Sequence, residues 1–379
     1  MNYILTNFAY GTGPFLRTTH EAIYFNNARE KQGRERWGIL VPLVYGEKQR
    51  SLMREVFAEH EKKHPGEILL SEALGAVLKK VFYENESFEA YLTRWIEAIH
   101  TARKEAHALI AGTFEAETLR GEKKIISGRD IAVELARSPR MSWGVERAYA
   151  VSFARMADIY REAGTLPFAE IAIDRRVLRE AATVAEGVEK NYKWFAIGFP
   201  GTLEALTHTN DFFVPPLGEI SAATSSGKPE GIYVSVSGIG GSEQLYENVR
   251  KIGGKMWSNR PDVIHGATKA DPAIMGTQPM FFQIARAGWG AIWLSLSTQT
   301  PLLLLPHDPS DDPEIALNIR AVEREGIGIV YRGESFDELL RKRAAVQARQ
   351  RKLCGEIKKR WGTFDGLAVA AELFSTPKN

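Results

Sequence analysis

A glycine-rich segment that follows an apolar stretch has the residue types that bind a phosphate group. The apolar stretch is 231–237, a helical pattern follows at 243–252, and the segment between them contains Gly238, Gly240, Gly241 and Ser242. Small residues let the backbone approach a ligand closely, and the start of a helix offers free N–H groups to an anion. A second segment of this kind contains Gly288, Trp289 and Gly290, with Arg286 as a nearby charge partner. The two segments predict a diphosphate site.

An acidic loop from His307 to Glu314 directly follows the apolar stretch 302–305. Open α/β sheets bind ligands at the carboxyl ends of their strands, so this loop is a candidate ligand-binding edge. Its carboxylates could also hold Mg²⁺ or Ca²⁺. However, two prolines stiffen the loop, and Asp312-Pro313-Glu314 is typical of a helix start. We therefore expect neither a metal ion nor a cofactor.

Other candidate ligand contacts also follow predicted strands. Gly11, Thr12 and Gly13 lie between an apolar stretch at 3–8 and a helical pattern at 17–32. This opening could contact a ligand, and a tight turn without a ligand is the equal alternative. His265 ends a predicted strand and His307 opens the acidic loop, so both are placed where α/β proteins bind ligands.

The elements that must position these residues alternate between strand and helix patterns in two blocks. Such alternation predicts parallel sheets covered by helices. We expect an α/β protein with two doubly wound Rossmann-like domains that face a cleft. The expected units are an N-terminal domain at 1–218 with a helical insertion at about 47–104, a C-terminal domain at 219–360, and a terminal helix at 361–379 that packs back on the first domain.

Periodicity also predicts where the individual elements lie. In the first block we expect strands at 3–8, 37–44, 106–112, 124–127, 170–174, 194–198 and 212–214, and helices at 131–136 and 143–163. In the second block we expect strands at 231–237, 255–258, 263–265, 284–287, 302–305 and 328–331, and a long helix that begins near 336.

Composition narrows the class of partner. The chain has 379 residues and a net charge of +2, which gives no case for a nucleic-acid partner. Cys354 is the one cysteine and cannot form an internal disulfide, so we expect a cytoplasmic location. No apolar stretch approaches the roughly 20 residues of a membrane span. The basic stretch 341–360 is typical of a solvated helix face, with a peripheral membrane contact as the alternative.

The order of these pieces resembles the two-domain GT-B glycosyltransferases, in particular the UDP-glycosyltransferases and the bacterial cell-wall N-acetylglucosaminyltransferases. The resemblance runs through 231–331 and rests on both glycine-containing segments, the apolar strand that ends in Pro306, the acidic loop and Asn318. It implies that the two glycine-containing segments cradle the diphosphate of a nucleotide-sugar donor. It also implies that Glu314 holds sugar hydroxyls and that Asn318 follows it on the same helix.

The sequence departs from that family at positions that matter for chemistry. Leu294 stands where the family has a glutamate for the ribose, and Phe15 stands where the cell-wall enzymes have a histidine. Sugar transfer needs a base that deprotonates the acceptor hydroxyl. His20 is the first candidate base and Asp130 the second; a histidine on the flank of a helix and an aspartate that caps a helix are the alternative interpretations.

The resemblance implies an enzyme of the hexosyltransferase type. It would move a sugar from a nucleotide-diphosphate donor, with UDP preferred, to an acceptor hydroxyl without a metal ion. One alternative is a nucleotide-sugar epimerase or hydrolase on the same fold. Another is a protein that binds a nucleotide sugar without turnover.

Overall fold

The first domain is built on a nine-stranded sheet. In the computed structural model, which describes residues 2–84, 86–218, 227–235, 246–247 and 254–376, the strand order is β5-β4-β3-β2-β1-β6-β7-β8-β9. The strands are β1 (Tyr3–Phe8), β2 (Gly38–Pro42), β3 (Ile68–Ser71), β4 (Thr113–Thr118), β5 (Lys123–Ser127), β6 (Ile131–Arg137), β7 (Ala148–Ser152), β8 (Trp194–Gly198) and β9 (Asp211–Val214). Neighbouring strands are parallel except where β4 pairs with β3 and β5.

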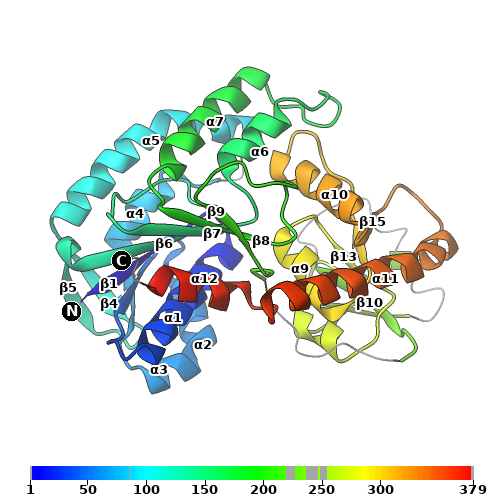
Figure 1. Ribbon diagram of the computed structural model, residues 1–379, viewed down its shortest axis with the longest axis horizontal. Coiled ribbons are helices and arrows are strands. Elements are labelled where there is room, and N and C mark those ends of the chain that lie inside the picture. Colours follow the sequence, from blue (N-terminus) through cyan, green and yellow to red (C-terminus); the bar gives the residue numbers. More distant parts are fainter. Residues whose placement is uncertain (1, 85, 219–226, 236–245, 248–253, 377–379) are drawn as a thin grey trace.

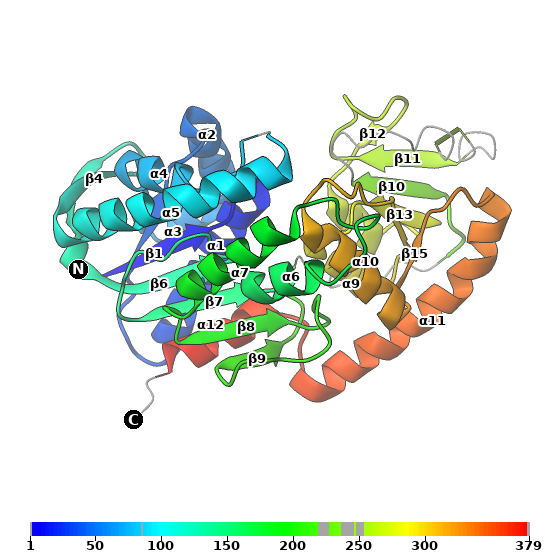
Figure 2. The ribbon, with the colours of Figure 1, turned by 90° about the horizontal axis from the view of Figure 1, so that it is seen from above.

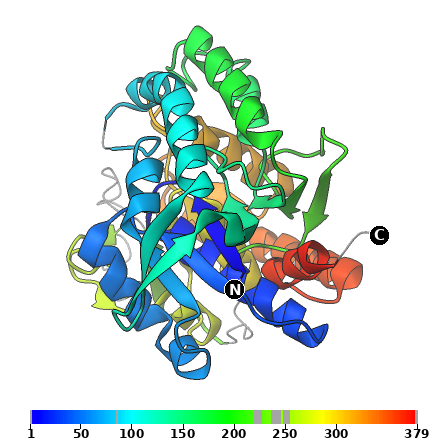
Figure 3. The same ribbon diagram turned by 90° about the vertical axis from the view of Figure 1, so that its left-hand side faces the viewer.

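Helices cover both faces of this sheet. They are α1 (Thr12–Lys31), α2 (Gly46–Val56), α3 (Ala58–Lys63), α4 (Glu72–Lys79), α5 (Phe88–Ala111), η1 (Gly128–Asp130), α6 (Met156–Ala163) and α7 (Arg175–Glu189). Figure 1 shows α5 and α7 above the strands and α1 below them, and Figure 3 shows α5 and α7 side by side. A parallel sheet covered on both faces needs apolar side chains on both, and every residue of β1 is buried accordingly.

The second domain has a six-stranded parallel sheet in the order β12-β11-β10-β13-β14-β15. Its strands are β10 (Gly231–Ser235), β11 (Lys255–Ser258), β12 (Thr268–Lys269), β13 (Phe282–Ala285), β14 (Leu302–Leu304) and β15 (Gly328–Val330). Its helices are η2 (Pro272–Gly276), α9 (Trp289–Thr298), α10 (Pro313–Glu325) and α11 (Phe336–Trp361). The expected α/β class with two parallel-sheet domains is therefore confirmed. Of the helix expected at 243–252 the structure describes 246–247, which are helical. The rest of that segment and residues 222–226 of the linker before β10 lie outside the described residues.

A strand replaces one expected helix in the first domain. Residues 131–136 form most of β6 and not a helix. Glu134 interrupts the apolar pattern of this strand, and it is fully buried. Asn7 donates to Glu134 Oε1 at 2.8 Å and the Tyr192 hydroxyl donates to it at 2.5 Å. These partners are distant in the sequence, so the local pattern could not show that a buried glutamate is satisfied here.

Other boundaries also differ from the expected ones. The stretch 47–104 is not a helical insertion, because it contains β3, which pairs with β2 inside the sheet. The strand expected at 106–112 is the last turn of α5, where Ala102 and Ala106 share one buried helix face. The helix expected at 143–163 contains β7 before α6. The stretches 170–174 and 263–265 form no strand.

The last helices connect the domains. Figure 2 shows α11 running along the second domain and α12 (Gly366–Ser375) lying against the first. Phe374 of α12 stacks on Tyr149 of β7 with 4.8 Å between ring centroids. A methyl group at Gly366 would lie 2.0 Å from the carbonyl oxygen of Pro215, so glycine is required there. In the described part of the chain, no helix is both long enough and apolar enough to cross a membrane.

The two domains also pack directly through α9. Trp293 is fully buried, and its indole Nε1 donates to the carbonyl of Pro200 at 3.0 Å. Gly198 ends β8 beneath the Trp293 ring, and a methyl group there would lie 2.4 Å from ring atom Cζ2. Close approach of the two domains therefore depends on the absence of a side chain at Gly198.

Replacing Gly198 with alanine should destabilise this junction. The added methyl group must displace Trp293, and such overpacking costs about 1–3 kcal/mol. Urea denaturation followed by tryptophan fluorescence measures the change. Gly355→Ala is the matched control, because a methyl group at Gly355 in α11 would meet no atom within 4 Å. Alanine in a helix should raise the free energy of unfolding by about 0.5–1 kcal/mol. A Gly198→Ala protein as stable as the wild type would contradict this packing.

Candidate active site

The carboxyl ends of strands from both sheets meet at the junction of the two domains, which we call the interdomain cleft. Tyr10 follows β1 of the first domain, and its hydroxyl donates to Asp312 Oδ2 at 2.8 Å. Asp312 follows β14 of the second domain and caps α10, where its Oδ1 accepts from the Glu314 backbone N–H at 3.0 Å. Ligands of α/β proteins bind at such edges. The predicted acidic loop therefore faces the other domain.

Asn318 of α10 is the central hydrogen-bonding residue of this cleft. It is fully buried, and its Oδ1 accepts from the Thr202 hydroxyl of the first domain and from Trp289 Nε1, both at 2.7 Å. Its amide nitrogen donates to the carbonyl of Ala287 at 2.8 Å and to Glu314 Oε1 at 3.1 Å. The predicted pair of Glu314 and Asn318 is therefore brought together one helical turn apart. This network also fixes Trp289 as a structural residue.

Burial and the neighbouring carboxylate of Asp312 raise the pKa of Glu314 above its usual range. The nearby guanidinium of Arg140 opposes this shift. Arg140 is 2% exposed, donates to the Tyr160 hydroxyl at 3.0 Å, and lies 5.5 Å from the centre of the Tyr10 ring. Glu314 thus combines a raised pKa with hydrogen-bonding capacity at the mouth of the cleft.

Glu21 and Arg137 form a second charged group that sequence reasoning missed. Glu21 is fully buried, and neither carboxylate oxygen has a hydrogen-bond partner among the described residues. Burial raises the pKa of Glu21 well above its usual range, and Arg137 partly offsets this shift. Burial and then Arg17 lower the pKa of Arg137 to about 10, while Glu314 acts in the opposite direction. Arg17 and Glu21 share one face of α1, a spacing that could have signalled them.

Of the two glycine-containing segments predicted to bind a diphosphate, the structure describes one. Gly238, Gly240, Gly241 and Ser242 lie outside the described residues. In the other segment Gly288 caps α9, and Gly290 is exposed in its first turn. The first N–H groups of a helix have no partner within the helix, so they can bind an anion. Arg286 precedes this turn and forms an ion pair with Asp311.

The remaining loop residues do not assemble a metal site in the described part of the chain. Asp308 accepts from the backbone N–H of Ser310 at 2.9 Å, and Asp311 pairs with Arg286. His307 is partly buried, burial lowers its pKa, and its ring nitrogens have no hydrogen-bond partner among the described residues. It lines a pocket together with Glu170 of the first domain and Arg320 of α10. His265 is exposed, in the segment between β11 and β12.

The structure does not bring either candidate base to Glu314. The ring of His20 lies 4.8 Å from that of Phe57, on the side of α1 that faces the α2–α3 junction. Asp130 precedes β6, whose first residue pairs with Tyr3, so it is exposed at the amino edge of the sheet. The cleft lies at the opposite edge. The prediction that placed Asp130 before a helix was wrong because β6 is a strand.

The structure also shows the surroundings of the first glycine turn and of Phe15 and Leu294, the two residues that differ from the family. Gly11 has a φ of 101°, and its N–H donates to the Tyr45 hydroxyl at 2.6 Å. Thr12 and Gly13 begin α1, and Gly13 is exposed. Phe15 is 1% exposed and Leu294 is 6% exposed, so both belong to the packed interior. Neither could take the polar role that the family assigns to its position.

Comparison with known proteins supports the architecture. No protein-family model and no curated protein matches the chain. Among solved structures, UGT71G1 of Medicago truncatula complexed with UDP-glucose matches with a TM-score of 0.60 at 10% identity, covering 99% of this chain and 98% of that one. The calicheamicin glycosyltransferase CalG4 matches with a TM-score of 0.55 at 14% identity, covering 98% and 97%.

A third matching structure contains two bound ligands. UGT2 of Phytolacca americana, complexed with UDP-2fluoro-glucose and pterostilbene, has a TM-score of 0.57 at 11% identity and covers 98% of this chain and 99% of that one. The matches span both domains and confirm the predicted GT-B fold. At identities this low, they establish architecture, and activity must be argued from the site.

Replacing Asn318 with alanine should loosen the cleft. The change leaves the carbonyl of Ala287 without its side-chain partner, whereas Trp289 Nε1 keeps the Thr202 hydroxyl at 2.7 Å. An unpaired buried group costs about 1–3 kcal/mol. Urea denaturation measures the loss of stability. Asn191→Ala is the control, because within the described ranges its side chain donates to the backbone carbonyls of Gly187 and Val188, away from the cleft. Equal effects of both variants on the unfolding of the two domains would contradict a special role for Asn318.

Proposed function

We propose that this chain is a glycosyltransferase that moves a sugar from a nucleotide-diphosphate donor to an acceptor hydroxyl. The observation that carries the proposal is the pairing of Glu314 with Asn318 at the start of α10, opposite Tyr10 of the first domain. A carboxylate at the mouth of a cleft between two Rossmann-like domains is suited to bind sugar hydroxyls. The solved structures of this fold with UDP-sugars support the same assignment.

In this proposal the second domain binds the donor. The first turn of α9, in which Gly290 is exposed, offers backbone N–H groups to the diphosphate, and Arg286 supplies positive charge beside it. The glycine pattern at 238–242, which lies outside the described residues, supports the same diphosphate assignment, and UDP is the preferred nucleotide. Charge developing on the leaving diphosphate is then stabilised by N–H dipoles and arginine, so we propose that no metal ion takes part.

The acceptor binds on the side of the first domain, near Tyr10 and Arg137. Glu314 accepts a hydrogen bond from a hydroxyl of the donor sugar. Its raised pKa, caused by burial and Asp312, also lets this group exchange a proton near neutral pH. Among the described residues of the cleft, it is our candidate for both roles.

Two other functions would use the same fold. A nucleotide-sugar epimerase or hydrolase would convert the donor in the absence of an acceptor, and product analysis separates it from a transferase. A protein that binds the donor without turnover is favoured by the buried Phe15 and Leu294, which stand at positions that carry polar residues in the family. Saturable donor binding without any product across broad acceptors would select this last function.

A nucleotide-sugar donor should stabilise the full-length protein against heat. A ligand at 100 times its Kd adds about 2.7 kcal/mol to the free energy of unfolding. A thermal-shift screen with UDP-, GDP- and dTDP-sugars measures this effect, and free sugars are the controls. We expect the largest shift with a UDP-sugar. The absence of a shift with every nucleotide sugar at millimolar concentration would eliminate the proposal.

Replacing Glu314 with alanine should weaken use of the sugar but not binding of the free nucleotide. The change leaves a desolvated sugar hydroxyl without its partner, which costs about 1–3 kcal/mol, so kcat/KM should fall roughly 5- to 150-fold. Calorimetry should give an unchanged Kd for free UDP. Glu323→Ala is the control, because Glu323 lies on the same helix and pairs with Arg332 on the surface. Full activity of Glu314→Ala would contradict the role assigned to Glu314.

A further inference from the structure

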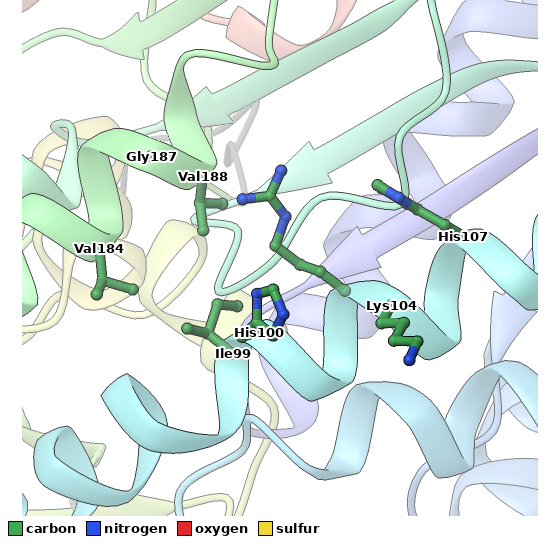
Figure 4. Close-up of a pocket in the computed structure, with 8 residues that line it drawn as sticks. Ile99, His100, Lys104, His107, Val184, Gly187 and Val188 are labelled. Atoms are coloured by element: carbon green, nitrogen blue, oxygen red, sulfur yellow. The ribbon is translucent and has the colours of Figure 1, made fainter.

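A groove between α5 and α7 lies on the outer face of the first domain. It has a volume of about 500 Å³. Ile99 of α5 and Val184 and Val188 of α7 make its apolar lining, and Gly187 adds no side chain that would fill it. Figure 4 shows Val184 and Val188 across the groove from Ile99 and His100. The volume and the apolar lining suit a small organic ligand.

Basic side chains surround the apolar lining. His100, Arg103, Lys104 and His107 come from successive turns of α5. Arg103 is half-buried, and neither it nor Lys104 has an ion pair or a side-chain hydrogen bond among the described residues. A guanidinium has five N–H donors in a fork that matches a carboxylate or phosphate. A half-buried arginine without a partner therefore offers an anion-binding group.

Four acidic side chains of the same two helices are engaged elsewhere, whereas Glu97 of α5 is exposed to solvent. Glu105 of α5 pairs with Lys80 at 2.5 Å, and Glu180 of α7 pairs with Arg176 at 2.9 Å. Glu186 pairs with Arg161. Glu189 is buried and accepts from the backbone N–H of Met156 at 2.5 Å. Because these carboxylates have their own partners, they do not neutralise Arg103 and Lys104.

The groove is separate from the interdomain cleft. His107 lies against Gly144, where a methyl group would be 2.6 Å from its Nε2, and Gly144 precedes the start of β7. Val188 likewise precedes the start of β8. Both contacts therefore lie toward the amino edge of the sheet, whereas Tyr10 and Arg137 lie at its carboxyl edge. A ligand in the groove would leave the cleft open to its substrates.

We propose that this groove is a second ligand site, which binds a small amphiphilic anion. The apolar part of the ligand packs on Ile99, Val184 and Val188, and its carboxylate or phosphate head pairs with Arg103. The apolar contact and the charged contact are both needed, since neither a neutral amphiphile nor inorganic phosphate satisfies both parts of the groove. In this proposal the site binds monomeric ligands and does not require a membrane surface.

Calorimetry on the full-length protein tests the site with octyl phosphate below its micelle-forming concentration. We expect saturable binding with one site per chain. Arg103→Gln should weaken it by about tenfold or more, because it removes a charge-assisted hydrogen bond. Gly187→Leu should weaken it by filling the groove, and the space around Gly187 admits a side chain. Arg179→Gln on the exposed side of α7 removes the same charge and should leave the Kd unchanged.

Three further probes distinguish this two-part site from a simple anion site, an apolar groove or a membrane-binding surface. Inorganic phosphate and neutral octyl glucoside should each bind at least about tenfold more weakly than octyl phosphate, because each lacks one of the two contacts. Affinity equal to that of octyl phosphate for either compound would overturn the proposal. So would binding to anionic vesicles without binding to monomeric octyl phosphate, or an equal loss of affinity in Arg103→Gln and Arg179→Gln. These measurements use no nucleotide sugar, so they stand apart from the test of transferase activity.

Discussion

The buried amide of Asn318 is the interaction on which the arrangement of the two domains depends. It accepts from Thr202 of the first domain and from Trp289 of the second, and it donates to Ala287 and Glu314. A buried polar group without a partner costs about 1–3 kcal/mol, so a shift of one domain would leave several groups unpaired at once. The hydrogen bonds of Asn318 therefore favour one arrangement of the two domains. That geometry holds the Glu314 carboxylate at the first turn of α10, facing the other domain.

Charge in the cleft is distributed between the domains around that amide. The first domain supplies the buried Arg140 and the partly buried Arg137, and the second supplies Asp312 and Glu314. Burial raises the pKa of both Glu314 and the enclosed Glu21, which favours their neutral forms. The two arginines then exceed the ionised carboxylates facing them. An excess of positive charge in a partly desolvated cleft is what a diphosphate leaving group requires.

Much of the fold was predictable because long, regular patterns dominate it. The apolar stretches that became β1, β8, β14 and β15 lie in covered parallel strands, where both faces are buried and the pattern is unambiguous. Two of the failures share one cause. Glu134 in β6 is satisfied by Asn7 and Tyr192, and β3 finds its place only by pairing with β2 and β4. Local sequence contains no record of such distant partners, and tertiary contacts override local preference.

The sequence by itself determined the two α/β domains, the acidic loop and its helix start, and the pairing of Glu314 with Asn318, because each depends on residues close together in the chain. Asp312 and Pro313 are typical of a helix start, and four-residue spacing places Glu314 and Asn318 on one helix face. Only the tertiary structure decided which residues share the cleft. It brought Tyr10 and Arg137 toward Glu314, and it placed Asp130 at the opposite edge of the sheet. The reason is physical: strand pairing and burial set distances between residues that are far apart along the chain, and no local periodicity encodes them.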